Sequence, residues 1–376
     1  MAPVTGDPHS SAYGAAGVDY ATLDAGKRSA LTEALATSAA LLGAPNGRAL
    51  DESRGEPAFV FEVGGLTLAF VVEGLGTKSI IARASEERLG SRAFDSVAYD
   101  AVAAIVNDLC CVGAEPLVVN AYFATGTSEW YEHSDRVTGL LAGWRRACED
   151  AGATWGGGES PALSGLVAAD EIELAGSSIG LVPAGRGPIL GKDLTPGDEI
   201  VLIASNGLHA NGASLARMIA ARLPAGYATR LPSGAELGEA LLAPSVIYVP
   251  LVRALLRSEV ELHYLSHITG HGLLKLMRAK AELGYEIERL PDVPEVLSFL
   301  AAEAEMSPAE AYRTLNMGAG FAVYCAAGHG ERVVELASGL GLAAHVAGAV
   351  RHGPRRVVLA PIGVTYGSGD LDLAPR

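Results

Sequence analysis

The chain has 376 residues, of which 49% are hydrophobic and 19% charged, and this composition excludes an intrinsically disordered protein. Its length favours two domains with separate cores. With 28 basic and 43 acidic residues the net charge is −15, which disfavours binding to nucleic acid or to anionic membranes because no basic patch offsets it. A secretory leader, a membrane-spanning apolar run and a C-x-x-C pair are not evident, so we expect a cytoplasmic protein with reduced cysteines.

The first half of the chain alternates helical and strand patterns. Residues 13–42 have helical composition, with Asp24 as the expected N-cap of the run from Ala25. The Gly64-Gly65 pair predicts a tight turn between two strands and hence a hairpin. The elements expected after residue 42 are strands at 58–62 and 66–72, a helix at 97–112, a strand at 116–124, a helix at 134–151 capped by Ser134, a glycine-rich loop at 155–161 and a strand at 172–182.

The run P-A-G-R-G-P at 183–188 is the expected domain junction. Beyond it we expect strands at 199–204, 285–288, 320–325 and 345–350, helices at 214–222, 244–258, from 273, at 293–304 and around 336, and loops at 205–212 and 263–272. The pattern predicts two α+β domains, at 13–183 and 184–360, between a flexible tail at 1–12 and an irregular tail at 361–376.

Two aspartates interrupt the apolar helix at 97–112. Asp100 and Asp108 are eight residues apart and project about 80° from each other, with Asn107 between them. Carboxylates in apolar surroundings need a cation or hydrogen-bond donors, and Mg2+ prefers such oxygen ligands. A ligand site and a solvated outer stripe of a core helix are equally consistent with this segment alone.

The sequence E-G-L-G-T-K at 73–78 follows a predicted strand. Its glycines allow close backbone approach, Lys78 supplies a positive charge, and Glu73 can hold a metal that neutralises phosphate oxygens. The spacing is not that of a Walker loop, and a structural turn is the alternative. Glu159, after three glycines, is a further metal-ligand candidate; Pro161 directly after Ser160 argues against a nucleophile elbow there.

His209 and His267 each lie on a predicted loop rich in glycine and polar residues, at 205–212 and 266–272. An imidazole in such a setting can bind phosphate or move a proton near neutral pH. Either histidine alone is more often a structural hydrogen-bonding group.

Taken together, these motifs resemble the aminoimidazole ribonucleotide synthetase family, also called phosphoribosylformylglycinamidine cyclo-ligase. The resemblance covers roughly residues 13–350, and its specificity lies in the combination. The matching motifs are A-A-G-V-D at 15–19, G-L-G-T-K at 74–78, V-N-D-L at 106–109, G-A-E-P at 113–116, A-T-G at 124–126, G-G-E at 157–159, G-L-H-A-N-G at 207–212, H-I-T-G at 267–270 and Y-R-T-L-N-M-G at 312–318.

The resemblance implies an N-terminal α/β half-barrel that pairs in a homodimer and a C-terminal α+β sandwich. It implies ATP-dependent cyclisation of formylglycinamidine ribonucleotide, a small nucleotide substrate, through a phosphorylated amide oxygen, with ATP and Mg2+ bound. By position it assigns catalysis to His209, His267 and Lys78; nucleotide binding to Gly74, Gly76, Thr77, Lys78, Asn107 and Asp108; substrate binding to Gly158, Asn211, Thr269 and Gly270; and Mg2+ to Glu73, Asp100, Asp108 and Glu159.

Three loops depart from the family pattern. Glu73 replaces an aspartate, the stretch from Ser160 to Leu163 lacks a second acid, and His271 stands where the family has glycine. These departures leave two alternatives: another ATP-dependent enzyme of the superfamily with a different acceptor, or a non-catalytic nucleotide-binding homologue. Selenophosphate synthetase fits poorly because no cysteine precedes Cys110, and thiamine-phosphate kinase does not account for the motif at 312–318.

Overall fold

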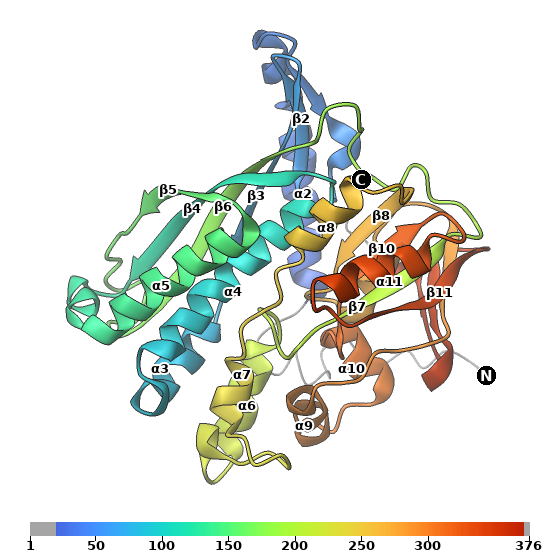
Figure 1. Cartoon of the computed structure of the whole chain (residues 1–376). Helices are drawn as coiled ribbons and strands as arrows, with labels where there is room; N and C mark the ends of the chain where they lie inside the picture. The colour runs from blue at the N-terminus through green and yellow to red at the C-terminus, as the bar shows by residue number, and fades with distance from the viewer. Residues whose placement is uncertain (1–19, 372–376) are drawn as a thin grey trace.

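The computed structural model of the chain describes residues 20–371 and contains two β-sheets, each with its own helices (Figure 1). The α+β class and the two-sheet organisation are therefore confirmed. The motif at 15–19 and the tail at 1–12 lie outside the described residues. Within the described part of the chain, no helix combines the length and the apolar character needed to cross a membrane.

The first sheet has six strands in the order β1-β2-β3-β6-β4-β5, all antiparallel except the β4–β5 pair. Two long helices, α4 and α5, cover one of its faces (Figure 1). The elements are α2 (Tyr20–Leu35), β1 (Arg48–Leu50), β2 (Phe59–Val63), β3 (Leu66–Gly74), α3 (Lys78–Leu89), α4 (Ser91–Cys110), β4 (Glu115–Thr125), α5 (Ser134–Ala151), β5 (Thr154–Glu159) and β6 (Ile172–Leu181), with short 3-10 helices at Ser38–Gly43, Asp51–Ser53 and Ser128–Glu132.

The second sheet has seven strands in the order β13-β12-β9-β11-β7-β10-β8. Its elements are β7 (Glu199–Ala204), α6 (Ala213–Arg222), α7 (Leu237–Leu241), α8 (Val249–Leu256), β8 (Leu262–His267), the 3-10 helix η6 (Gly272–Met277), β9 (Leu283–Ile287), α9 (Glu295–Glu303), α10 (Pro308–Thr314), β10 (Ala319–Cys325), α11 (Gly330–Gly339), β11 (Ala344–His352), β12 (Arg356–Leu359) and β13 (Val364–Gly367), with short 3-10 helices at Gly226–Ala228, Ala360–Ile362 and Ser368–Asp370. Helix α8 packs against α4, α5 and β4 of the first unit as well as against α11.

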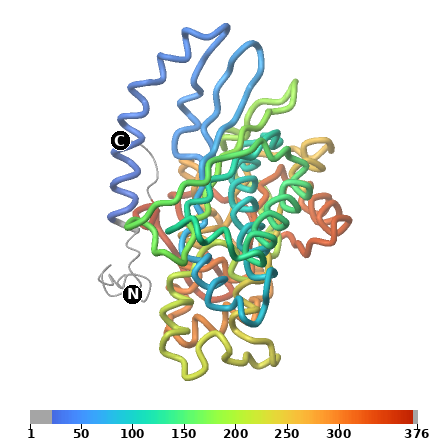
Figure 2. Tube along the Cα trace, turned by 90° about the vertical axis from the view of Figure 1, so that its left-hand side faces the viewer, coloured from blue at the N-terminus to red at the C-terminus, as the bar shows by residue number. Residues whose placement is uncertain are grey.

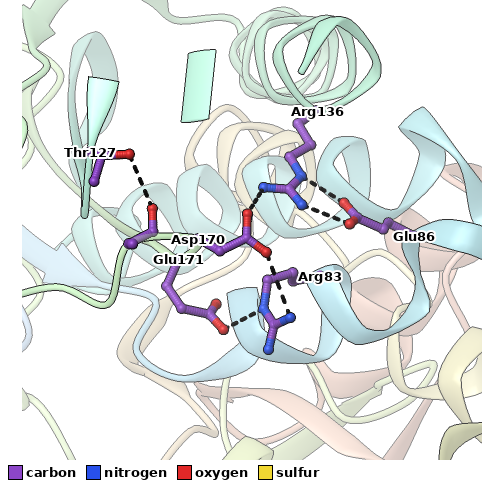
Figure 3. A network of polar contacts seen from close by, with 7 residues as sticks. Arg83, Glu86, Thr127, Arg136, Asp170 and Glu171 are labelled. Carbon is purple, nitrogen blue, oxygen red and sulfur yellow. Dashed lines mark hydrogen bonds and ion pairs between the residues drawn. The ribbon is translucent and has the colours of Figure 1, made fainter. Parts of the chain in front are cut away.

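A buried arginine ties the helices of the first unit together. Arg136 on α5 is only 5% exposed and donates two hydrogen bonds of 2.7 Å to the Glu86 carboxylate on α3. It also contacts Asp170 in the segment before β6, where Arg83 binds the neighbouring Glu171 (Figure 3). Because these pairs join α3, α5 and the start of β6, they fix the helix that begins at Lys78.

Helix α2 runs along one side of the molecule toward the β2–β3 hairpin (Figure 2). Asp24 lies inside this helix, so its prediction as an N-cap was wrong. Its carboxylate Oδ2 lies 2.9 Å from Nε2 of His271, and both residues are buried. This contact joins α2 to the loop after β8.

Several predicted loops and ends were wrong. Residues 154–159 form β5, parallel to β4, and not a glycine loop; a Cβ at Gly158 would lie 2.1 Å from the Ala121 carbonyl oxygen, so glycine permits this close pairing. Residues 262–267 form β8, and residues 272–277 form a 3-10 helix. The expected irregular tail contains β13, which pairs with β12. Ser134 is the first residue of α5 and provides no side-chain cap.

Candidate functional site

The first polar cluster is a buried ion pair between α3 and α4. Lys78 and Asp100 have fully buried side chains, and the Lys78 ammonium lies 2.5 Å from Asp100 Oδ2. The ammonium also donates a 2.7 Å hydrogen bond to the carbonyl oxygen of His209, and Asp100 Oδ1 accepts one of 2.7 Å from the Ser245 N–H. Lys78 and Asp100 thus hold the first unit against two loops of the second.

A second cluster joins β3, α4 and β8. Oδ1 of Asp108 lies 2.6 Å from Nδ1 of His267, and the Glu73 carboxyl group is close enough to Asp108 for the two groups to affect each other's ionisation. Burial, and then the Asp108 charge, raises the pKa of Glu73 to about 8. Burial opposes ionisation of Asp108 too, but the hydrogen bond from His267 and its charge lower the pKa of Asp108 overall. Near neutral pH the pair therefore keeps one proton.

Lys275 on η6 is close enough to this carboxyl pair for its charge to affect both carboxyl groups. The residue is 7% exposed. Its positive charge opposes the rise in the pKa of Glu73 and contributes to the lowered pKa of Asp108. Burial, and then repulsion by Arg278, lowers the pKa of Lys275 itself to about 8. The sequence reasoning missed this residue, although a single cation within the apolar run L-L-K-L-M was a signal that could have pointed to it.

Both predicted histidines lie near the ring of Tyr248. The Tyr248 ring centroid is 6.4 Å from each imidazole, and its hydroxyl donates to the Ala204 carbonyl oxygen. Nε2 of His209 lies 2.9 Å from the Asn206 side-chain oxygen, whereas its Nδ1 is buried without a partner among the described residues. Burial lowers the pKa of His209 to about 3, so this imidazole is neutral at pH 7.

Asn107 was predicted to contact a nucleotide, but here its amide holds the loop before α8. Its Nδ2 donates to the Val246 carbonyl oxygen, and its Oδ1 accepts from the Tyr248 N–H, each at 2.8 Å. Both ends of the amide are therefore used in joining the two units, so its nucleotide role stays a prediction.

The predicted glycine-containing turn around Gly76 connects β3 to α3 in the structure. Gly76 has a positive φ of 70°, and its backbone N–H acts to lower the pKa of Glu173 on β6, although burial raises that pKa overall. The Thr77 hydroxyl lies 3.1 Å from that of Ser214 on α6. Gly74 is exposed at the end of β3, so backbone is accessible to a ligand next to the half-buried Glu73.

Gly158 and Glu159 are exposed on the edge strand β5, away from Glu73. The register aligns Glu159 with Tyr122, Ala175 and Gly74 across β5, β4, β6 and β3. Three strand spacings, about 14 Å, therefore separate Glu159 from Gly74. The described chain does not bring Glu159 to the Glu73–Asp108 pair.

The other predicted substrate residues lie on the loop that carries His209 and on the loop that follows His267 at the end of β8. Asn211, Thr269 and Gly270 are half-buried, which leaves them within reach of a ligand. The turn at Thr269 is closed by the Gly272 N–H, and His271 adopts a left-handed φ of 71° there.

The predicted four-carboxylate magnesium set is not assembled. Within residues 20–371 no three His, Cys, Asp or Glu side chains group as a metal site. Asp100 is engaged by Lys78, and it lies about 12 Å from Asp108 along α4, because eight residues of helix rise by that length. The Glu73–Asp108 pair alone fits Mg2+, which commonly takes one or two carboxylates and completes its shell with water and phosphate.

A crevice of about 520 Å³ opens next to Asn206, the residue that contacts His209. Asn206 and Ser245 line it from the second unit, and Tyr99 and Arg146 from α4 and α5. It provides room for a small molecule where the two units meet.

The fold and these contacts define a class: a protein of two α+β units whose polar site lies where the units meet. Family models described as AIR synthase related protein match both parts, the N-terminal domain at residues 55–182 and the C-terminal domain at 195–360. The chain belongs to the AIR synthase related family.

Similar curated proteins bear the name phosphoribosylformylglycinamidine cyclo-ligase. One from Methanobrevibacter smithii is 34% identical over 284 residues, which cover 75% of this chain and 79% of that protein. Another, from Methanothermobacter thermautotrophicus, is 34% identical over 79% of this chain and 83% of its own length.

Solved structures with the same fold are more distant in sequence. A HypE–HypF complex matches with a TM-score of 0.57 at 17% identity over 85% of this chain and 93% of that chain. PurL of T. maritima, complexed with ATP, matches with a TM-score of 0.53 at 17% identity over 82% of this chain and 45% of that chain.

Proposed function

We propose that the chain converts formylglycinamidine ribonucleotide to aminoimidazole ribonucleotide in purine biosynthesis, with hydrolysis of ATP to ADP and phosphate. The observation that carries this proposal is the Glu73–Asp108–His267 cluster, because it combines motif residues from both halves of a chain that is 34% identical to cyclo-ligases. ATP binding is supported by related folds that were crystallised with ATP.

Glu73 and Asp108 would hold Mg2+, which supplies neutralisation of phosphate charge. Phosphoryl transfer needs mainly positioning and electrostatic stabilisation. For the nucleotide we propose backbone contacts at Gly74, Gly76 and Thr77, with Asn107 and Lys78 shaping the adjoining wall. For the ribonucleotide we propose Asn211, Thr269, Gly270 and Gly158.

The two histidines would serve ring closure. In the proposed reaction the amide oxygen of the substrate first attacks the γ-phosphorus of ATP and releases ADP. A nitrogen of the same substrate then attacks the activated carbon and closes the ring, and phosphate leaves with loss of one proton. His209 is neutral at pH 7 and its Nδ1 has no partner in the described chain, so this nitrogen would accept a hydrogen bond that orients the attacking nitrogen; a pKa of about 3 makes it too weak a base to take the proton. His267, bonded to Asp108, would position the phosphorylated oxygen.

We also propose a homodimer formed through the first sheet. The face opposite α4 exposes apolar side chains: on β3 Leu66, Phe70 and Val72 are 53%, 42% and 63% exposed, and on β4 Leu117 and Tyr122 are 45% and 37% exposed. A second copy covering this face would remove those side chains from water. Light scattering should give twice the mass of the chain, and Val72→Asp should give monomer; monomeric wild type would contradict the dimer.

The function is tested by incubating wild type with Mg-ATP and formylglycinamidine ribonucleotide while ADP and aminoimidazole ribonucleotide are measured together. The proposal expects equal amounts of both products. ADP without aminoimidazole would indicate another acceptor, and nucleotide binding without turnover would indicate a non-catalytic homologue; either result would overturn the proposal.

A further inference from the structure

Two lysines are buried in the described chain, and they differ in their partners. The Lys78 ammonium is satisfied by Asp100 and by the carbonyl oxygen of His209. The Lys275 ammonium forms neither a hydrogen bond nor an ion pair with any residue between 20 and 371, although the residue is only 7% exposed. Its Nζ is not among the fully buried unsatisfied atoms of the described chain, so the ammonium still meets solvent and is open to an anion that could replace its remaining hydration.

The backbone fixes where Lys275 stands. All six residues of η6 are buried, and the Lys275 carbonyl oxygen accepts hydrogen bonds from the Ser266 hydroxyl at 3.0 Å and from the Arg278 N–H at 3.1 Å. The side chain therefore projects from a buried, hydrogen-bonded turn that follows the loop after β8. Such a base suits a group that must meet a ligand in one position.

The surroundings of Lys275 favour an anion beside the carboxyl pair. Glu73 and Asp108 are near enough to interact with its charge but do not reach ion-pair distance. Arg278 is already occupied, since it donates two hydrogen bonds to the Gly55 carbonyl oxygen. Lys27 on α2 adds a second positive charge nearby, and the Asp24–His271 contact fixes that helix to the same loop.

We propose that Lys275, rather than Lys78, is the cation that binds a phosphate group at this site. The inference rests on the proposed function, which supplies two phosphate sources, the ATP polyphosphate and the 5′-phosphate of the ribonucleotide. The phosphate oxygen lies against the Lys275 ammonium and next to the carboxylates that would hold Mg2+. Lys78 keeps its structural contacts throughout.

The variants are Lys275→Met, which removes the charge at similar volume, and Lys275→Arg, which retains it. Lys192→Met is the matched control, because Lys192 is an exposed lysine outside the site. Calorimetry in the presence of Mg2+ measures binding of ATP, ADP, adenosine and formylglycinamidine ribonucleotide to each protein.

Lys275→Met should weaken phosphate-bearing ligands at least tenfold and leave adenosine unchanged, with Lys275→Arg in between. Weaker ATP and ADP would identify the polyphosphate as the bound group, and a weaker ribonucleotide alone would identify the 5′-phosphate. Unchanged affinity for all ligands would overturn the inference, as would equal weakening of adenosine. If Lys275→Met does not fold, the same calorimetric binding series is measured with Lys275→Gln and Lys275→Arg.

The two proposals can fail separately. Wild type that binds nucleotide without producing aminoimidazole would refute the cyclo-ligase activity, while the binding series still tests Lys275. Full wild-type activity together with unaltered ligand binding by Lys275→Met would refute the role of Lys275 alone.

Discussion

Replacing Lys78 by methionine should destabilise the fold itself. The side chains of Lys78 and Asp100 are both fully buried, so the variant leaves a carboxylate away from water with the Ser245 N–H as its remaining donor. Breaking a buried ion pair from one side typically costs about 3–5 kcal/mol. For 376 residues unfolding together, about 4 kcal/mol corresponds to a fall of roughly 5 °C in the unfolding midpoint.

Urea unfolding without nucleotide, followed by circular dichroism, measures this loss. The double variant Lys78→Met/Asp100→Asn removes the orphaned charge and should recover at least half of the lost stability, whereas Lys192→Met should behave as wild type. A loss below about 1 kcal/mol in Lys78→Met would refute the structural role of the pair. If the affinity for ATP also fell tenfold in that variant, Lys78 would instead be assigned to nucleotide binding.

Three further changes test other contacts. The pKa of His209 is about 3 in the fold against 6.5 ordinarily, so the unfolded state alone takes up a proton between these values and stability falls on acidification, by at most about 1.4 kcal/mol per pH unit. His209→Asn, which tolerates the left-handed φ of 57°, should flatten urea midpoints measured from pH 7 to pH 4. His271→Gly should relieve about 1 kcal/mol of backbone strain but release Asp24, so limited proteolysis should cut α2 faster; an unchanged cleavage pattern would count against this contact. Arg136→Met should cost about 2 kcal/mol, because the guanidinium is buried while its partner Glu86 is partly exposed, and a cycle with Glu86→Gln should give coupling above 0.5 kcal/mol.

Local sequence patterns predicted the elements whose apolar periodicity or turn residues lie within a single segment. The hairpin followed from Gly64 and Gly65, which adopt φ values of 59° and 84°, and the strands on either side match β2 and β3 within two residues. The helix at 134–151 and the strand at 199–204 have the predicted bounds. In each case the residues themselves supply the periodic apolar face or the turn.

Elements that depend on a distant partner were not predictable in this way. The glycines of β5 indicated a loop because they lack side chains to bury, but β4 supplies the hydrogen bonds that make the segment a strand. Residues 263–272 were likewise assigned to a loop, and pairing with β10 makes the first part of this segment the end of β8. Pairing between segments so far apart in sequence leaves little local trace.

The site shows the same division. The helical angle between Asp100 and Asp108 suggested one shared ligand, but the angle ignores their separation of about 12 Å along the axis. Because of this distance along α4, each aspartate has its own partner, one from the first unit and one from the second. Asp100 meets Lys78 under the His209 loop, and Asp108 meets His267.

Because of this separation, the two ends of α4 have different roles. At the Asp100 end every charge has a direct partner, which suits a contact that must persist while ligands come and go. At the Asp108 end the carboxyl pair retains a proton and the Lys275 ammonium lacks a direct partner in the described chain, so charges there are incompletely compensated. Mg2+ together with a phosphate would supply what each lacks, the cation for the carboxyl pair and the anion for the ammonium. Because both arrive together as Mg-ATP, binding of the complex should be favoured over binding of either component alone.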